Sequence, residues 1–521
     1  MNTTVFRVGF VVCVLVAALF RVIDLEQRVL HNDEANQACR AGLLLEGAGY
    51  HYDPVDHHGP TLYYLSLPFA WLSAGTDFSR TSAVTYRLLP ALFGIGVLLL
   101  LLLFRDRLGR PAVLATAALL AVSPAMVYYS RFYIQEMLLV FFTAAVIVCG
   151  CRYSRFPGVR QAMSVGLFLG LMHATKETCI IAYACLGAAI LPALIDMMRK
   201  GAEARRQLLQ HGLVMVAVAV AVSAMIFSSF FTHPMGIIHS YTAYLNYLPQ
   251  GIGVDTDHVQ PFMFYLKILI GQTKGGLFWS EWPIMLLGLT GIGFSVTGAS
   301  RWLPDLHRGL ARFLVSYTVL MTLAYSLIAY KTPWCMLSFL FGWILLAGIG
   351  AAGLFASCKP RALQAVLVVL VLAGVSLLGR SAQRASFRYG ADTRNPYAYS
   401  HTVSDLLNLV KRVNAVTALG DGYAAKIAIV TNAQDAWPLP WYLRTYPNTG
   451  YWSTQDAIPE AFAPDIIVCS LEHEPAVTES VGDDFISEYW GLRNEVVLAL
   501  YLRRDLWDRF MESRIKSHPT N

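Results

Sequence analysis

The stretch VGFVVCVLVAALFRVIDLEQRVLHNDEANQACR (residues 8–40) joins an apolar segment to a cluster of polar and acidic side chains. Residues 8–23 are the first of about eleven apolar windows of membrane-spanning length. The motif His31-Asn32-Asp33-Glu34 follows in the first loop, and ionisable side chains beside a membrane are candidates for a functional site by default. The stretch therefore predicts a polytopic α-helical membrane protein that carries out chemistry on a lipid-borne substrate.

The composition supports a membrane protein. Of the 521 residues, 56% are hydrophobic and only 14% are charged, whereas a soluble domain carries about 25% charged residues. The net charge is +6, but Lys and Arg fall mainly in loops between apolar windows, where they set topology. We therefore expect membrane lipids as partners and no nucleic acid. The nine cysteines show no zinc-binding spacing and no disulfide framework.

The orientation follows from the charged loops. Clusters of Lys and Arg occupy alternate loops, which places these loops and the N-terminus in the cytoplasm. We expect an uncleaved first helix, because no small-residue cleavage site follows it. The protein is then a multi-pass protein of the cytoplasmic (inner) membrane with its active site facing outside. The predicted spans lie near residues 8–23, 84–104, 111–128, 136–151, 161–175, 178–197, 211–231, 279–298, 311–329, 334–353 and 362–379.

The composition changes after Arg380. Residues 381–521 have ordinary charge density, and their short apolar runs alternate with helix-like stretches. This rhythm predicts a small soluble α/β domain. We therefore divide the chain into a transmembrane catalytic domain (1–380) and an exterior α/β domain (381–521). The apolar runs are AKIAIV (425–430), DIIVC (465–469) and VVLALYL (496–502).

Asp33 and Glu34 have two interpretations. In the first, they are solvated acids at a helix N-terminus, where Asn32 or Asp33 caps the helix and the charges suit its dipole. In the second, they form a catalytic pair in which a carboxylate takes a proton from an incoming acceptor hydroxyl or amine. A sugar held by a phosphate ester is already activated, so such an enzyme needs a base and phosphate stabilisers but no nucleophile of its own.

Isolated cations lie at the outward ends of predicted helices, against the positive-inside bias. One interpretation is that they extend to lipid headgroups; the other is that they converge on a leaving phosphate. Lys176 has the acid Glu177 as its neighbour, and the two could simply neutralise each other. The candidates for donor phosphate binding are Arg131, Lys176 and Lys331, and three arginines follow the last span at Arg380, Arg384 and Arg388.

Histidines and a glutamate in the outward loops raise the question of a metal. Histidine and carboxylate can hold a divalent cation such as Mg, Mn or Zn, but their spacing matches no known site, and hydrogen-bonding roles compete. The metal candidates are Glu136, His58 and His233. Aromatic side chains could pack on a sugar ring or form an ordinary core. The full set of substrate-binding candidates is His57, His58, Glu136, Tyr330, Trp334, Trp437 and Trp441.

Six motifs together resemble the GT-C glycosyltransferases, with protein O-mannosyltransferases and lipid A aminoarabinose transferases as similar branches. More narrowly, the set looks like the subgroup labelled flippase-activity-associated protein Agl23. The motifs run along nearly the whole chain: HNDEA (31–35), DHHGPTLYY (56–64), YYSRFYIQE (128–136), YKTPW (330–334), NPYAYSHT (395–402) and WPLPWYLR (437–444).

The resemblance implies an integral-membrane transferase with a polyprenyl-phosphate-linked sugar donor and a protein, lipid or glycan acceptor. Asp33 matches the family's catalytic acid, Glu34 its partner and Arg131 the arginine of the second exterior loop. Glu136 lies where related enzymes keep an acid, and the oligosaccharyltransferase branch binds a divalent metal there. Asp33 would deprotonate or orient the acceptor, while Arg131 with Lys331 or Lys176 stabilises the departing phosphate.

Two other functions compete with the transferase. A lipid-linked sugar flippase or transporter would place its polar residues near the bilayer midplane within inverted repeats, and the sequence shows no repeated half. A non-catalytic partner of such a protein is the other alternative. No GxGxxG motif or P-loop is present, in keeping with a lipid-linked donor.

Overall fold

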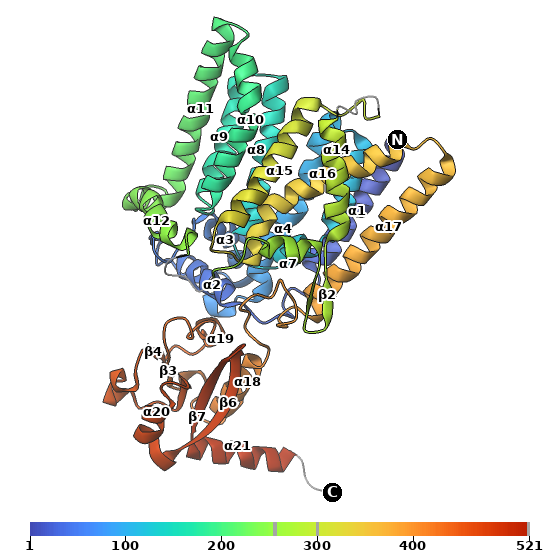
Figure 1. Cartoon of the computed structure of the whole chain (residues 1–521). Coiled ribbons are helices and arrows are strands. Elements are labelled where there is room, and N and C mark those ends of the chain that lie inside the picture. The colour runs from blue at the N-terminus through green and yellow to red at the C-terminus, as the bar shows by residue number, and fades with distance from the viewer. Residues whose placement is uncertain (254–257, 298–301, 518–521) are drawn as a thin grey trace.

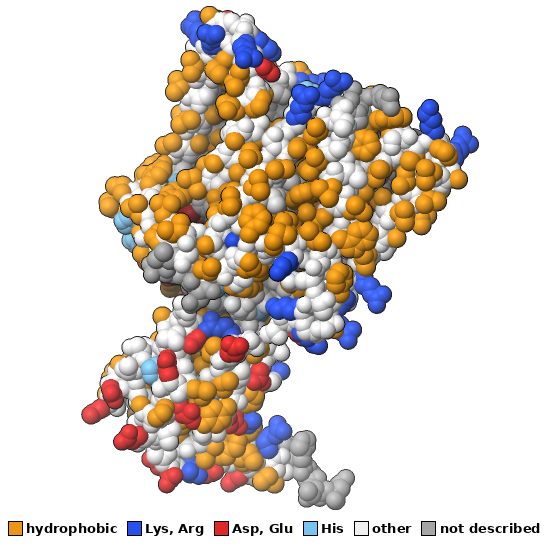
Figure 2. Space-filling model, in the orientation of Figure 1, with side chains coloured by type: hydrophobic (Ala, Val, Ile, Leu, Met, Phe, Trp, Pro, Cys, Tyr) orange, Lys and Arg blue, Asp and Glu red, His pale blue; other side chains and the backbone are white. Residues whose placement is uncertain are grey.

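The computed structural model describes residues 1–253, 258–297 and 302–517. A large bundle of helices forms the N-terminal part, and a smaller α/β domain lies at one end of it (Figure 1). Hydrophobic side chains cover most of the face of the bundle that Figure 2 shows, which suits contact with lipid. The chain is thus a polytopic helical membrane protein with a C-terminal α/β domain.

Within the described residues, eight helices are long and apolar enough to cross a membrane. The span of α4 (Ala83–Leu100) continues through short helical segments to Leu108, and α16 (Leu337–Ser357) is preceded by the turn Pro333–Met336. These helices are α1 (Thr3–Val22), α4 (Ala83–Leu100), α8 (Glu136–Arg155), α10 (Cys179–Met198), α11 (Ala202–Phe227), α15 (Arg308–Leu327), α16 (Leu337–Ser357) and α17 (Arg361–Gln383).

The other three predicted windows also contain helices, but of different shape. Helices α6 (Arg110–Val122) and α7 (Pro124–Ser130) meet at an angle of 59°, so the pair is either a broken ninth span or a re-entrant loop. The carboxylate of Glu281 accepts hydrogen bonds at this bend from the Ala125 N–H (2.9 Å) and the Ser123 hydroxyl (2.6 Å). Helices α9 (Val159–His173) and α14 (Trp282–Val296) have only 15 residues each, shorter than a full span.

Short elements cover the end of the bundle that faces the α/β domain. Helices α2 (Asn32–Leu45) and α3 (Thr61–Ala74) fill the long first loop, as the sequence predicts. Helix α12 (Met235–Gly251) lies to one side of them (Figure 1). Helix α13 (Phe264–Ile270) leads into the hairpin of β1 (Gln272–Lys274) and β2 (Leu277–Trp279).

The far end of the bundle carries exposed cations. Figure 2 shows Lys and Arg gathered where α10 meets α11 and at the far end of α17. The N-terminus lies at this end too, since the Arg110 side chain donates a hydrogen bond to the Met1 carbonyl oxygen (3.4 Å). This is the distribution from which the sequence places that end in the cytoplasm.

The C-terminal domain is built on a five-stranded sheet of order β4-β3-β5-β7-β6. The first three strands are parallel and the last two pair antiparallel. Helices α18 (Leu406–Thr417) and α21 (Arg504–Ser517) pack on each other, and α20 (Glu474–Val481) contacts β5. The strands are β3 (Ile427–Val430), β4 (Thr449–Trp452), β5 (Ile466–Ser470), β6 (Phe485–Arg493) and β7 (Val496–Arg503).

The segment between the two parts belongs partly to the bundle. Tyr397 and Ala398 lie in the same hydrophobic core as the transmembrane helices, whereas the core of the α/β domain begins at Leu406. The domain also contacts the first loop through the short helix α19 (Leu439–Tyr442). The Tyr442 hydroxyl lies 2.9 Å from the Leu30 N–H, so the domain sits directly over the start of the HNDE motif.

Candidate active site

The candidate site begins at the N-terminus of α2, where His31 caps the helix. The His31 Nδ1 accepts a hydrogen bond from the Asp33 N–H (3.0 Å), and the Glu34 carboxylate accepts one from the His31 N–H (3.2 Å). This is a capping box with histidine in the usual Ser or Thr position. The cap is therefore His31, and Asn32 and Asp33, the two caps considered from the sequence, are both inside the helix.

His31 is a neutral, buried imidazole. Burial lowers its pKa, although the neighbouring acids Asp33 and Glu34 oppose that shift. Because Nδ1 accepts the Asp33 N–H, the ring proton sits on Nε2, which lies 3.1 Å from the Tyr399 carbonyl oxygen. His31 thus positions the motif with both of its ring nitrogens.

Glu34 is held by two buried arginines. Its carboxylate is fully buried and accepts two parallel hydrogen bonds of 2.7 Å from Arg87, and Arg28 lies 3.4 Å away. The backbone N–H of Tyr133 donates a further hydrogen bond at 3.0 Å. Burial alone would raise the carboxyl pKa of Glu34, but the guanidinium groups of Arg87 and Arg28 outweigh it and hold the pKa well below its usual range. Glu34 is therefore a permanent anion that fixes the start of α2.

Asp33 is the member of the motif that remains accessible. Its side chain is 39% exposed, and its Oδ1 lies 3.7 Å from Nδ1 of the neutral His31, which is not an ion pair. The adjacent Glu34 is fully buried, so the two acids that the sequence pairs have opposite environments. Asp33 alone presents a carboxylate to an incoming molecule.

Lys176 and Glu136 form a second buried ion pair. Burial lowers the pKa of the Lys176 ammonium, but Glu136 raises it by more, so the side chain stays charged. The second carboxylate oxygen of Glu136 is buried without a hydrogen-bond partner among the described residues. Burial raises the pKa of Tyr330, and the charges of Lys176, Asp33 and Glu136 are near enough to act on it as well. Tyr330 therefore lies within electrostatic reach of the Lys176–Glu136 pair and of Asp33.

Glu177 pairs with His58 rather than with Lys176. The two side chains are 2.8 Å apart, and the Tyr52 hydroxyl donates to the same carboxylate at 3.2 Å. Burial acts to raise the pKa of Glu177, but the contact with His58, a backbone hydrogen bond and the Lys176 charge together leave it below its usual value. The sequence interpretation in which Lys176 and Glu177 neutralise each other is wrong, because each has its own partner.

The side chains of Arg131 and Lys331 donate their hydrogen bonds to backbone carbonyl oxygens. The Arg131 guanidinium donates to the carbonyl oxygens of Phe20 (3.2 Å) and Asp24 (2.9 Å) and to that of Ile23, all at the end of α1. Lys331 is 1% exposed and donates to the carbonyl oxygens of Gln260 (3.0 Å) and Ile328. A phosphate-binding role for either stays a prediction.

The remaining candidates line the surroundings. Buried His57 accepts from the Asp53 N–H (3.3 Å) and lies 3.2 Å from the Tyr50 hydroxyl, and the Trp334 ring packs on Phe132 and His31. Trp441 is buried between the two parts of the chain, with Arg444 3.9 Å above its ring. Trp437 is half-buried against the bundle core. These contacts are structural, and sugar binding by these residues stays a prediction.

The three metal candidates lie in three different pairs. Glu136 contacts Lys176, His58 contacts Glu177, and the ring of His233 lies 3.6 Å from that of His51. No group of three or more His, Cys, Asp or Glu that could hold a metal occurs in residues 1–253, 258–297 and 302–517. The donor set in this conformation does not make a cation site, and the requirement for a divalent cation stays a prediction.

Two residues that organise the site were missed in the sequence. Arg87 lies inside the apolar window 84–104, and Arg28 precedes the HNDE motif. A charged side chain inside a predicted span is itself a signal, because it must find a partner in the bundle. Arg87 could therefore have been identified as a candidate, but Glu34, 53 residues away, could not have been identified as its partner.

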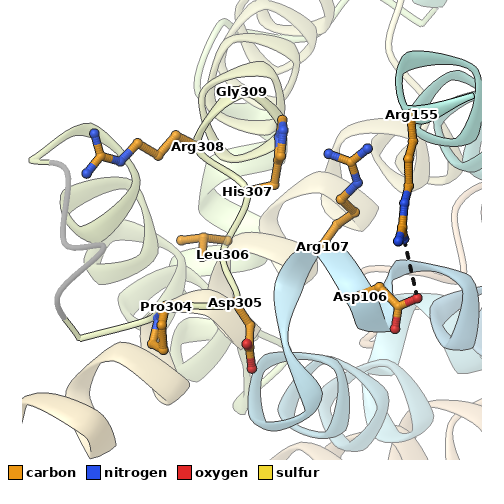
Figure 3. Close-up of a pocket in the computed structure, with 9 residues that line it drawn as sticks. All are labelled: Asp106, Arg107, Arg155, Pro304, Asp305, Leu306, His307, Arg308 and Gly309. Atoms are coloured by element: carbon orange, nitrogen blue, oxygen red, sulfur yellow. Dashed lines mark ion pairs between the residues drawn. The ribbon is translucent and has the colours of Figure 1, made fainter.

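A cavity of about 660 Å³ lies at the opposite end of the bundle. Figure 3 shows Arg107 and His307 side by side at its wall, with Arg155 directed toward Asp106. The Arg155 and Asp106 side chains are both more than half exposed and 3.7 Å apart. The cavity includes none of the predicted site residues.

Part of the chain matches a known family model. Residues 60–238, about a third of the chain, match the family model described as dolichyl-phosphate-mannose-protein mannosyltransferase. The match includes Lys176 and Glu136 but not Asp33. No curated protein sequence matches the chain.

Solved structures extend the likeness to the whole chain. The Archaeoglobus fulgidus oligosaccharyltransferase tethered with an acceptor peptide is 14% identical with a TM-score of 0.59, covering 99% of this chain and 78% of that one. ArnT from Cupriavidus metallidurans bound to undecaprenyl phosphate is 15% identical with a TM-score of 0.60, covering 97% and 99%. The chain has the GT-C fold. The Agl23 subgroup within this GT-C superfamily stays a prediction.

Proposed function

We propose that this GT-C protein transfers a sugar from a polyprenyl-phosphate-linked donor to an acceptor at the membrane face that carries the α/β domain. The observation that supports it most is the contrast within the HNDE motif, where buried Glu34 is fixed by Arg87 and Arg28 while Asp33 remains exposed. A base needs access to its proton donor and a rigid support, and this arrangement supplies both.

In the proposed reaction Asp33 takes the proton of the acceptor hydroxyl or amine. The acceptor atom attacks the anomeric carbon of the sugar from the side opposite the phosphate. The bond between that carbon and the phosphate oxygen breaks, its electron pair leaves with the polyprenyl phosphate, and the configuration inverts. Glu34 is a positioning residue in this scheme, since it contacts the protein on both of its oxygens.

Lys176 is our candidate for the leaving phosphate. Arg131 and Lys331 donate to backbone carbonyl oxygens. Lys176 instead pairs with Glu136, and its charge, like that of Asp33, acts on Tyr330. A fixed cation aimed at developing negative charge stabilises the transition state without reorganising. Polyprenyl phosphate and dolichol phosphate occupy structures of ArnT and of the Archaeoglobus fulgidus enzyme AglB, which supports this class of donor.

The test is Asp33→Asn, which keeps the size of the side chain but removes its basicity. We expect release of polyprenyl phosphate from polyprenyl-phosphate mannose, the donor class named by the family model, to fall by about 10²–10⁴-fold. Asp56→Asn is the matched control, because Asp56 is an exposed acid of the same loop, paired with Arg40. Full turnover in Asp33→Asn with unchanged folding would refute the base, and sugar movement across the membrane without transfer would favour a flippase.

A further inference from the structure

Basic side chains gather where α17 reaches the end of the bundle that carries the α/β domain. We call this surface the basic rim and define it as Lys274, Arg384, Arg388 and Arg394. Figure 2 shows Lys and Arg side chains there, below the ends of α17 and β2 as labelled in Figure 1. The β1–β2 hairpin brings Lys274 into the rim, since Gly275 lies against the Arg394 side chain.

Three arginines of the rim surround one aromatic ring. The guanidinium carbons of Arg384, Arg388 and Arg394 lie 5.8, 5.3 and 5.2 Å from the ring centre of Tyr389. Arg384 also lies 5.0 Å from the ring of Trp279. Each stacking contact is favourable, but like charges this close repel one another unless an anion joins them.

The rim has too few acids to balance its charge. Asp392 pairs with Arg394 at 2.7 Å, and its charge also acts on Lys274. In the described part of the chain, Arg384 and Arg388 have no carboxylate partner within ion-pair distance. The rim therefore carries an excess of positive charge, and Arg384 and Arg388 are its unpaired members.

The backbone at this point has an unusual form. Residues Arg384–Arg388 make a π-helical turn directly after α17, closed by the hydrogen bond from the Tyr389 N–H to the Arg384 carbonyl oxygen (2.9 Å). Such turns are rare and recur at functional sites. The turn puts Phe387 against Arg131, at 4.4 Å, while Arg388 remains exposed on the surface.

The rim directly follows the apolar length of α17. Only 6% of the apolar window of α17 is buried in the protein, so this helix faces lipid along its length, and we infer that the rim reaches the lipid headgroups. The rim lies at the end opposite the cations that the sequence places in the cytoplasm, where the topological bias disfavours Lys and Arg. Arginines that only extend individually to lipid headgroups would not need to lie around a single ring, as Arg384, Arg388 and Arg394 do around Tyr389.

We propose that the basic rim binds a phosphate group carried by a membrane lipid. Arginine grips phosphate with two parallel hydrogen bonds, and one phosphate between Arg384 and Arg388 would balance both charges. Two lipids carry this chemistry, an anionic phospholipid of the leaflet and a polyprenyl phosphate. Lipid binding at the rim is measured in the absence of any sugar transfer. A failure of the rim to bind lipid phosphate would therefore leave the proposed transferase function untouched.

The experiment titrates the purified full-length chain in detergent and reads bound lipid by native mass spectrometry. The probes are short-chain phosphatidylglycerol, phosphatidylcholine of the same chain length, farnesyl phosphate and inorganic phosphate. We compare wild type with Arg384→Gln/Arg388→Gln. The matched control is Arg160→Gln/Arg206→Gln, which removes two exposed arginines from the other end of the bundle.

We expect the rim variant to lose about 10- to 100-fold in affinity for at least one lipid phosphate, while the control stays at wild-type affinity. A loss for phosphatidylglycerol identifies a leaflet phospholipid, and a loss for farnesyl phosphate alone identifies a polyprenyl phosphate. Arg384→Lys/Arg388→Lys should keep part of the binding, because the charge remains. Equal affinities in wild type and a folded rim variant, or inorganic phosphate binding as tightly as the lipids, would overturn the proposal.

Discussion

The two ends of the helical bundle hold their charges in different ways. At the end remote from the α/β domain, Arg155 and Asp106 are more than half exposed and border an open cavity. At the other end, the pairs Glu34–Arg87 and Lys176–Glu136 are less than a tenth exposed. Exposed charges of the first kind contribute little to stability and mainly orient the chain in the membrane. Buried pairs of the second kind are costly unless their geometry is fixed, which suits a reaction site.

The sharpest test of this contrast is the loss of one partner in a buried pair. Arg87→Met leaves the Glu34 carboxylate buried without its two main hydrogen bonds, and we expect a loss of about 3–5 kcal/mol in folding free energy. Thermal unfolding of the detergent-solubilised chain measures it. Arg152→Met is the control from the remote end, with an expected change within about 0.5 kcal/mol. Similar melting temperatures for the two variants would contradict the idea that buried charges at one end of the bundle are more important for stability than exposed charges at the other.

The second test asks whether the Lys176 charge serves the reaction or only its partner. Lys176→Met/Glu136→Gln removes both charges, so no uncompensated charge remains in the core. We expect donor turnover to fall by about 10²–10³-fold, the scale of losing one donor that stabilises the leaving group. Glu136→Gln alone removes the carboxylate that raises the pKa of buried Lys176, so the turnover of this variant should approach that of wild type only at low pH, where the ammonium group is still charged. Equal losses in the two variants at every pH would transfer the role from Lys176 to Glu136.

The smallest expected effect concerns pH. Burial lowers the pKa of His57 to about 4, with Arg40 acting in the same direction, so folded His57 stays neutral where an unfolded His with a pKa near 6.5 takes up a proton. Stability should therefore decline as the pH falls from 6.5 toward 4, by up to about 3 kcal/mol from this group. His57→Gln should flatten the dependence of melting temperature on pH in this interval. His473→Gln, in the α/β domain, should leave the slope as it is; a wild-type slope in His57→Gln would contradict the assignment.

Much of the fold was predictable because hydrophobicity is a local property. A helix occupies each of the eleven windows, and the runs at 425–430, 465–469 and 496–502 contain β3, β5 and β7. The windows did not reveal where helices stop. Helix α9 ends at His173, and its window continues into a loop that carries Lys176 and Glu177. The bend between α6 and α7 is likewise invisible in a count of apolar residues.

The site was predictable only in its composition. Asp33, Glu136, Lys176 and Tyr330 come from four separate loops or helix ends; Lys176 and Glu136 form an ion pair, and Tyr330 lies within electrostatic reach of that pair and of Asp33. Their individual environments depend on partners far away in the chain, such as Arg87 for Glu34 and the end of α1 for Arg131. Hydrogen-bond geometry decides which acid of the pair Asp33–Glu34 is buried, and no spacing in the sequence encodes it.

The bend between α6 and α7 has a consequence for how the chain is made. Its backbone donor at Ala125 depends on Glu281, which is synthesised about 156 residues later, and Glu281 in turn accepts a hydrogen bond from Tyr397. At about 5–20 residues per second, the ribosome needs roughly 10–30 s to supply that carboxylate. Helix α7 leads into the loop whose Tyr133 N–H binds Glu34. The bend that leads into this candidate site therefore gains its carboxylate support only after more than half of the chain has been synthesised.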